Sequence, residues 1–220
     1  MASCESKLTP EEFHRQQLLK KREGVGFLYP PFAEVINDLL RTIQQHQMPF
    51  QVYETYRTPA RQKRLVELGL AKIPDPLSNP HVHGLAVDFL LDYRAVRSLK
   101  PNKLSRLTES DVNQRQRNIS DDYGGVYNLG VNMIPTTIHP ARTKVEDKVV
   151  LDFWNNLGLL IERQYPQLVW GGKFNLKRGE LIGTDPPHVE FRDAPTLIKQ
   201  RSALRVLRAN GNPGLEEIKL

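Results

Sequence analysis

The chain has 220 residues, 39% of them hydrophobic, which suits one good-sized domain, or a domain with a large insertion, that buries a substantial core without disulfides. Its single cysteine, Cys4, excludes a disulfide framework and a closed zinc site built from thiolates. No run approaches the roughly 18 apolar residues that a membrane-spanning helix needs, so we expect a soluble protein without a membrane span.

The net charge of +6 favours an anionic partner such as a cell-wall polymer, nucleic acid or a membrane surface, although an ordinary solvated basic surface explains it equally well. The basic residues are dispersed among acidic ones, except at residues 20–22 and in a C-terminal stretch with Lys199, Arg201, Arg205 and Arg208. Because no nucleic-acid motif accompanies them, nucleic acid is not the expected partner.

The N-terminus lacks the charged start, apolar core and cleavage site of a secretory signal, which predicts a protein made in the cytoplasm. Residues 1–29 are expected to form a helical extension, with a helix from Thr9 to Arg22. Thr9 serves as its cap, Pro10 occupies the first position and Glu12 completes a capping box.

Two more helices and a strand are predicted before residue 70. After a turn over residues 24–31, one face of a helix is marked by apolar residues at helical spacing, namely Phe32, Val35, Ile36, Leu39, Leu40 and Ile43. Residues 50–54 have the composition of a strand, and Thr58-Pro59 is typical of a helix start. Arg57 therefore lies at a strand-to-helix turn, where polar residues often line sites; an exposed arginine on an ordinary loop is the alternative.

Residues 80–91 combine a histidine-led turn with an apolar strand that contains one carboxylate. Asp88 shares a strand face with Ala86 and Leu90, because side chains alternate with period two. Both faces are otherwise apolar, which indicates a strand covered on both sides, where a carboxylate needs a cation beside it. His81 can fold back toward Asp88, because Gly84 permits the tight turn between them.

A third ligand, His188, precedes another short strand. Together with His81 and Asp88 it predicts a metal site with three nitrogen or oxygen ligands and an open position, the usual arrangement of catalytic zinc. His83 is the alternative to His81, since two residues along a strand it would share its face. Glu190 shares a strand face with His188. It is expected either to orient that histidine or to be simply a charged residue at the rim of the site.

The remaining segments complete the predicted domain. Residues 92–142 are polar and rich in turn signals, so we expect an insertion or flap that helps to shape a substrate groove. A capping box at Thr143 begins a long amphipathic helix. A short strand follows at residues 168–170, where Trp170 either lines a cleft or packs in the core, and residues 193–220 form a basic helix and tail. This pattern indicates an α+β fold, with a small antiparallel sheet flanked by helices.

The motifs resemble those of the zinc peptidoglycan peptidases, the family of D-alanyl-D-alanine carboxypeptidases and L-alanyl-D-glutamate endopeptidases. Its first motif, Ser-x-His-x-x-Gly-x-Ala-x-Asp, is matched by His81, Gly84, Ala86 and Asp88, with Asn79 in place of the serine. Its second motif places an acid three residues before the last zinc histidine, as Asp185 stands before His188.

Two further motifs are similar to the endopeptidase branch. Trp170-Gly171-Gly172 precedes the acid, and Tyr56-Arg57 is followed by Gln62. The sequence departs from that branch at Lys173-Phe174, which replaces an acid and a tryptophan, and in a longer segment before Asp185.

The resemblance covers roughly residues 30–192 and implies that they form a zinc peptidase domain with the Hedgehog/DD-peptidase-like zinc fold. It implies a Zn²⁺ ion on His81, Asp88 and His188, and cleavage of the L-alanyl-D-glutamate bond of peptidoglycan stem peptides. A D-alanyl-D-alanine carboxypeptidase is the close alternative. A basic binding module on the same scaffold, without turnover, is the hypothesis from a different class.

The resemblance also implies roles for residues around the metal. Asp185 is the expected general base, with Glu180 as a rival, and Arg57 is the expected cation for the tetrahedral oxyanion. Substrate contacts are expected from Tyr56, Gln62 and Trp170. With no secretory signal, the expected setting is action on the cell wall after release, as in a phage lysis enzyme or a virion component.

Overall fold

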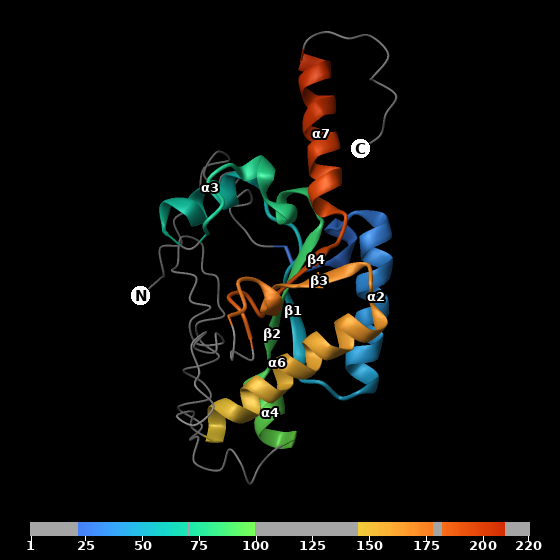
Figure 1. The fold of residues 1–220 in the computed structure, drawn as a ribbon, viewed down its shortest axis with the longest axis vertical. Coiled ribbons are helices and arrows are strands. Elements are labelled where there is room, and N and C mark those ends of the chain that lie inside the picture. The colour runs from blue at the N-terminus through green and yellow to red at the C-terminus, as the bar shows by residue number, and fades with distance from the viewer. Residues whose placement is uncertain (1–21, 70, 100–144, 178–181, 210–220) are drawn as a thin grey trace, which may run out of the picture.

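The computed structural model describes residues 22–69, 71–99, 145–177 and 182–209 (Figure 1). Within these ranges the strands form one antiparallel sheet in the order β1-β2-β4-β3. The strands are β1 (Phe50–Glu54), β2 (Ala86–Leu91), β3 (Leu168–Trp170) and β4 (His188–Phe191). The predicted α+β class, with a small antiparallel sheet and flanking helices, is confirmed.

Helices connect and cover the strands. The α-helices are α2 (Pro30–Gln45), α3 (Pro59–Glu67), α4 (Tyr93–Leu99), α6 (Val145–Gln164) and α7 (Ala194–Ala209). Short 3-10 helices are η1 (Val25–Phe27), η2 (Pro76–Ser78), η3 (Pro80–His83) and η6 (Gly171–Lys173). None of these helices has the length and apolar character needed to cross a membrane.

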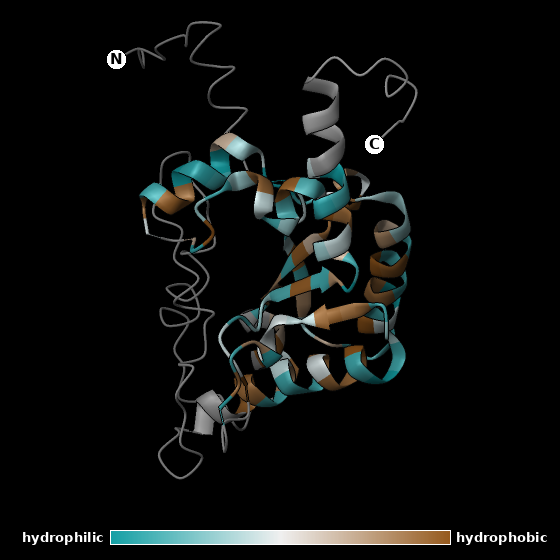
Figure 2. Cartoon of the chain, turned by 45° about the horizontal axis from the view of Figure 1, so that its top comes forward, coloured by the Kyte–Doolittle hydropathy of each residue, from teal (hydrophilic) through white to brown (hydrophobic). Residues whose placement is uncertain are grey.

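The main core lies between α2, α6 and one face of the sheet (Figure 1). The strand β2 contributes Val87, Phe89 and Leu91 to this core, as the period-two alternation of the sequence requires. The helices contribute residues of which the largest are Phe32, Ile36, Leu39, Trp154, Leu157 and Ile161. Figure 2 shows hydrophobic and hydrophilic residues alternating along α2 and α6, which is the pattern of helices with one buried face.

The opposite face of β2 carries Asp88 and Leu90. Leu90 packs with Tyr53 of β1 and Leu65 of α3 in a second, smaller cluster. All six residues of β2 are buried, so the prediction of a strand covered on both sides is confirmed. The carboxylate of Asp88 therefore lies in the interior of the protein.

Several predicted boundaries agree with the structure, whereas others lie outside the described residues. The strands at 50–54 and 168–170 form as predicted, and Thr58 caps α3 by accepting a hydrogen bond from the Arg61 amide. The first part of the predicted insertion, residues 93–99, is the helix α4, whose Val96 is buried in the main core. The capping box at Thr143, the rest of the insertion and the predicted helix from Thr9 lie outside the described residues, except for the predicted last residue of that helix, Arg22, which forms an isolated β-bridge with Tyr56.

The turn between η3 and β2 depends on Gly84. Its φ angle is +65°, in the left-handed region that glycine adopts most easily, and a Cβ atom there would lie 2.8 Å from the carbonyl oxygen of Phe27. The predicted tight turn is confirmed. Gly69 has a similar φ of +70° but open space around it. Comparing the two glycines therefore distinguishes the cost of the backbone conformation from the cost of a steric clash.

We expect Gly84→Ala to destabilise the protein more than Gly69→Ala. The left-handed conformation costs an L-residue roughly 1–2 kcal/mol at either position, and at Gly84 the backbone of Phe27 must move as well. Urea denaturation of the two variants measures both losses in the free energy of unfolding. Equal losses would mean that the chain around Phe27 yields without cost.

Candidate metal centre

Three side chains lie in a row across β1, β2 and β4. The sheet register pairs Glu54 with Asp88, and it pairs Asp88 with His188. Side chains of directly paired residues lie on the same face of a sheet. The row therefore brings two carboxylates and an imidazole together on the face opposite the main core.

A bulge in β1 aligns this row. The register pairs Val52 with Phe89 and then Glu54 with Asp88, so that Tyr53 is an extra residue in β1. Such bulges re-aim the side chains that follow them and are common beside functional sites. With regular pairing Tyr53 would stand opposite Asp88 instead of Glu54.

His81 reaches the row from η3. The side chain of Asn79 accepts a hydrogen bond of 2.9 Å from the His81 amide and caps this short helix, and Gly84 ends it. The carbonyl oxygen of His81 accepts a further bond of 3.1 Å from the Arg57 amide. Asn79 thus caps this turn at the position where the similar peptidase motif, Ser-x-His-x-x-Gly-x-Ala-x-Asp, has a serine.

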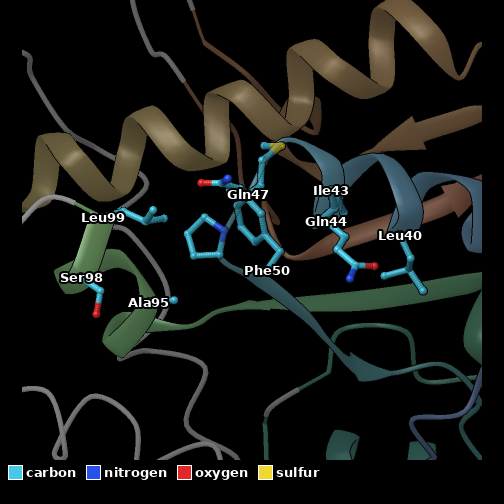
Figure 3. Close-up of a pocket in the computed structure, with 10 residues that line it drawn as sticks. Leu40, Ile43, Gln44, Gln47, Phe50, Ala95, Ser98 and Leu99 are labelled. Carbon is cyan, nitrogen blue, oxygen red and sulfur yellow. The ribbon is translucent and has the colours of Figure 1, made fainter.

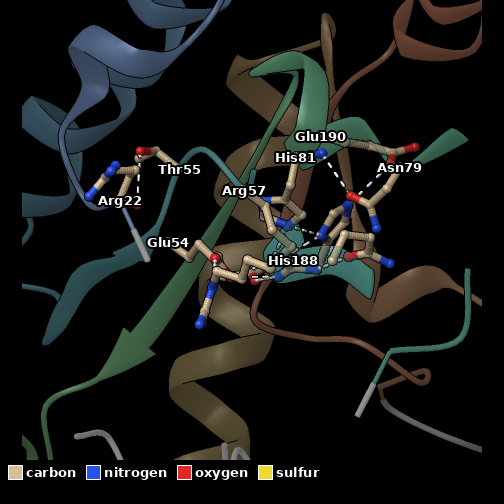
Figure 4. A network of polar contacts seen from close by, with 11 residues as sticks. Arg22, Glu54, Thr55, Arg57, Asn79, His81, His188 and Glu190 are labelled. Atoms are coloured by element: carbon tan, nitrogen blue, oxygen red, sulfur yellow. Dashed lines mark hydrogen bonds and ion pairs between the residues drawn. The ribbon is translucent and has the colours of Figure 1, made fainter. Parts of the chain in front are cut away.

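His81, Asp88 and His188 bring three possible ligand atoms close together. Figure 4 shows the two histidines beside each other. Oδ1 of Asp88 lies 3.2 Å from Nε2 of His81 and 3.2 Å from Nδ1 of His188, and the two ring nitrogens are 3.3 Å apart. All three residues are buried. Zinc bonds of about 2.0–2.1 Å in a regular tetrahedron give ligand separations of about 3.3–3.4 Å. The triangle therefore fits one face of a tetrahedral metal site.

The outer nitrogens of the two histidines differ in their surroundings. Nε2 of His188 lies 3.1 Å from Oε2 of Glu190, the carboxylate partner that commonly orients a metal-bound histidine. This contact agrees with the orienting role predicted for Glu190. Nδ1 of His81 is buried and has no hydrogen-bond partner among the described residues.

The charges around the triangle favour a cation. Burial lowers the pKa of His188, but its hydrogen bonds to Asp88 and Glu190 outweigh burial and raise that pKa to about 10. Burial likewise opposes ionisation of Asp88, yet the two histidines hold the pKa of this carboxyl well below its usual range. The site therefore stabilises positive charge next to an ionised carboxylate.

Asp185 lies beside the triangle on the loop before β4. Its amide donates to the carbonyl oxygen of Gly171, and its own carbonyl oxygen accepts a 3.1 Å bond from the His188 amide. A Cβ atom at residue 171 would collide with the Asp185 carbonyl oxygen, so a glycine is required there. Burial raises the pKa of Asp185, against the opposing charge of His188. A raised carboxyl pKa suits a group that exchanges protons.

Trp170 fixes the same loop from behind. Its indole nitrogen donates a 2.8 Å hydrogen bond to the Pro186 carbonyl, and its ring is buried against Gly158 and Gly172, neither of which has room for a Cβ atom. Of the two alternatives predicted for Trp170, the structure has the core position. In this structure the indole supports the loop of Asp185 and His188.

Arg57 is buried beside the triangle in a network of polar contacts (Figure 4). Its guanidinium donates to Oε2 of Glu54 at 2.6 and 3.1 Å, to Oε1 of Gln62 at 2.9 Å, and to Oδ2 of Asp88 at 3.4 Å. Arg61 donates to Oε1 of Glu54 at 2.6 Å. Burial opposes ionisation of Glu54, but the charges of Arg57 and Arg61 outweigh it and lower the pKa of that carboxyl.

The other predicted site residues lie around this network. Gln62 is fully buried, and its amide nitrogen donates to the Ile73 carbonyl, so in this structure it supports Arg57 and exposes no surface to a substrate. Tyr56 is half-buried and stacks on Phe27 with ring centroids 6.5 Å apart. Substrate contacts by these residues remain predictions. Glu180, the rival base, lies outside the described residues.

The argument that made His83 a rival ligand was wrong about local structure. His81 and His83 lie on the 3-10 helix η3 and not on a strand, so residues two apart do not share a face. The ring of His83 turns toward the Leu77 carbonyl oxygen, 2.7 Å from its Nε2. His81 is the histidine of this turn that joins Asp88 and His188.

A separate cavity of about 570 Å³ lies between the end of α2, the start of β1 and α4 (Figure 3). It is lined mainly by apolar side chains, including Leu40, Ile43, Met48, Phe50 and Leu99. None of the three possible metal ligands lines it. The candidate site is therefore defined by its side-chain chemistry and not by this cavity.

Comparison of the chain with models of protein families, with curated proteins and with solved structures found no match.

We expect the protein to bind roughly one divalent transition-metal ion per chain. His81→Ala and His188→Ala each remove a ligand and should lose most of the metal, whereas His83→Ala, whose ring contacts Leu77, should keep it. Elemental analysis after dialysis, with thermal melting as a check on folding, measures this. Loss of metal in His83→Ala alone would contradict the ligand assignment.

Proposed function

We propose that this chain is a zinc-dependent peptidoglycan hydrolase that cleaves the L-alanyl-D-glutamate bond of stem peptides. The observation that carries the proposal is the buried triangle of His81, Asp88 and His188, with atom separations of 3.2–3.3 Å and Asp185 beside it. The order and spacing of the sequence motifs support the choice of substrate. The net charge of +6 supports attraction to an anionic cell wall.

Zinc is the metal that suits this ligand set best. Two imidazoles and one carboxylate leave a position open, which is typical of catalytic zinc, and tetrahedral geometry is typical of zinc. When bound, zinc would supply Lewis acidity that activates water and polarises the scissile carbonyl. Glu190 would keep His188 in the tautomer that leaves its Nδ1 free to bind the metal, because its carboxylate accepts the N–H of Nε2.

Asp185 is the proposed general base. Its carboxylate would take a proton from the attacking water and pass it to the departing amine, which leaves as the peptide bond breaks. Two features support this role: burial raises its pKa, and the loop that carries it is fixed to His188 by a backbone hydrogen bond. Arg57, which is buried beside the triangle, is proposed to stabilise the oxyanion.

Mass spectrometry of purified peptidoglycan after digestion tests the reaction. We expect stem peptides to be cut after L-alanine, with D-glutamate as the new N-terminal residue. Release of free D-alanine alone would instead indicate a D-alanyl-D-alanine carboxypeptidase. Binding to sacculi without any new product, in zinc-loaded protein, would favour a non-catalytic basic module and would contradict the proposal.

Asp185→Asn should retain zinc and the fold but lose activity by roughly a hundred to ten thousand fold, the contribution of general acid and base catalysis. Release of new amino groups from purified cell wall measures the rate, and elemental analysis measures the metal. Asp152→Asn, an exposed position on α6, is the matched control and should leave both unchanged. Near wild-type digestion by Asp185→Asn, with loss in Glu180→Gln, would identify Glu180 as the base.

A further inference from the structure

Glu54 is a buried carboxylate to which the proposed reaction assigns no role. Its side chain has no exposed surface, and it accepts hydrogen bonds from Arg57 and Arg61, the shortest from each at 2.6 Å. Burying a carboxylate is costly unless cations and hydrogen bonds compensate it. The bulge in β1 nevertheless places this carboxylate directly opposite Asp88, a proposed metal ligand.

The two oxygens of Asp88 face different partners. Oδ1 lies 3.2 Å from the ring nitrogens of both His81 and His188, whereas Oδ2 lies 3.4 Å from Nη2 of Arg57. A carboxylate held by its second oxygen cannot turn freely about its terminal bond. Arg57 therefore favours the orientation in which Oδ1 points toward the metal position.

The same Nη2 atom of Arg57 lies much closer to Glu54 than to Asp88. It is 2.6 Å from Oε2 of Glu54 and 3.4 Å from Oδ2 of Asp88. Nη2 and Nε of Arg57 both donate to the same oxygen, Oε2 of Glu54, so the stronger interaction is the one with Glu54. Without that bond, the guanidinium of Arg57 would interact more strongly with Asp88 and would compete with a metal ion for it.

We propose that Glu54 is a positioning residue of the metal centre. It fixes Arg57 and balances its charge, so that Arg57 orients Asp88 through Oδ2 and leaves Oδ1 to the metal. This inference rests on the metal centre of the proposed function and not on the reaction that the centre performs. Removing a residue that orients a metal ligand through hydrogen bonds commonly lowers metal affinity by about 10–100-fold.

The competing explanation is that Glu54 only ties β1 to α3 through Arg61. A purely structural anchor would lower the stability of the fold when it is changed but would leave metal affinity and ligand geometry as they are. The two explanations therefore differ in what happens at the metal.

The test uses Glu54→Gln, which keeps the shape of the side chain and removes its charge. We expect zinc affinity, measured by competition with a chromogenic chelator, to fall about 10–100-fold. The visible absorption spectrum of the cobalt-substituted protein should also change, because it reports ligand geometry. Leu39→Ala, a core change in α2, should melt earlier with unchanged zinc affinity.

Wild-type zinc affinity and an unchanged cobalt spectrum in Glu54→Gln would overturn the inference. If Glu54→Gln does not fold, Arg57→Lys decides the matter, because a lysine keeps the charge but has a single nitrogen, which cannot replace the several guanidinium contacts with Glu54 and Asp88. Weaker zinc binding by Arg57→Lys supports the inference, and unchanged binding overturns it. A wild-type chain that binds neither metal refutes the metal centre and this inference together. Tight metal binding without cleavage of peptidoglycan refutes only the proposed reaction.

Discussion

The burial of one carboxylate, that of Asp88, is the constraint on which the rest of the site depends. Every residue of β2 is buried, so this group has exchanged its hydration for contacts within the protein. Both of its oxygens are compensated: Oδ1 by two imidazoles and Oδ2 by the Arg57 guanidinium. A charged group in such a place destabilises a fold unless its partners are held in position, and the surrounding chain provides that support.

His81 lies on a 3-10 turn and His188 at the start of β4, and backbone contacts as well as side chains fix the segments that carry them. Asn79 and Gly84 define the 3-10 helix of His81, and the Arg57 amide holds its carbonyl oxygen. The loop of His188 is held through Pro186 by the indole of Trp170, which in turn needs glycines around it. Since α2 and α6 pack on the other face of the sheet, the core supports the site from behind without supplying a ligand.

The sequence predicts the residues of the triangle because their chemistry stands out locally. One carboxylate in an apolar strand and a histidine before a glycine turn identify Asp88 and His81, and clear strand and helix periodicity predicts the elements around them. The sequence around Glu54 does not mark it as a site residue. It ends an ordinary strand, and its position opposite Asp88 depends on a bulge that the local sequence pattern does not predict. His83 could not be separated from His81, since a 3-10 helix and a strand end look alike over four residues.

The charges near the triangle also bear on what kind of ion it suits. Four acidic side chains, Glu54, Asp88, Asp185 and Glu190, lie at or next to the triangle, and Arg57 and Arg61 donate hydrogen bonds to Glu54. Arg57 contacts Oδ2 of Asp88, whereas Glu190 and Asp185 lie near His188. A proton on His188 compensates one charge, which explains why its pKa is raised to about 10. A doubly charged ion would compensate the carboxylates while the histidines stay neutral, as metal ligands must.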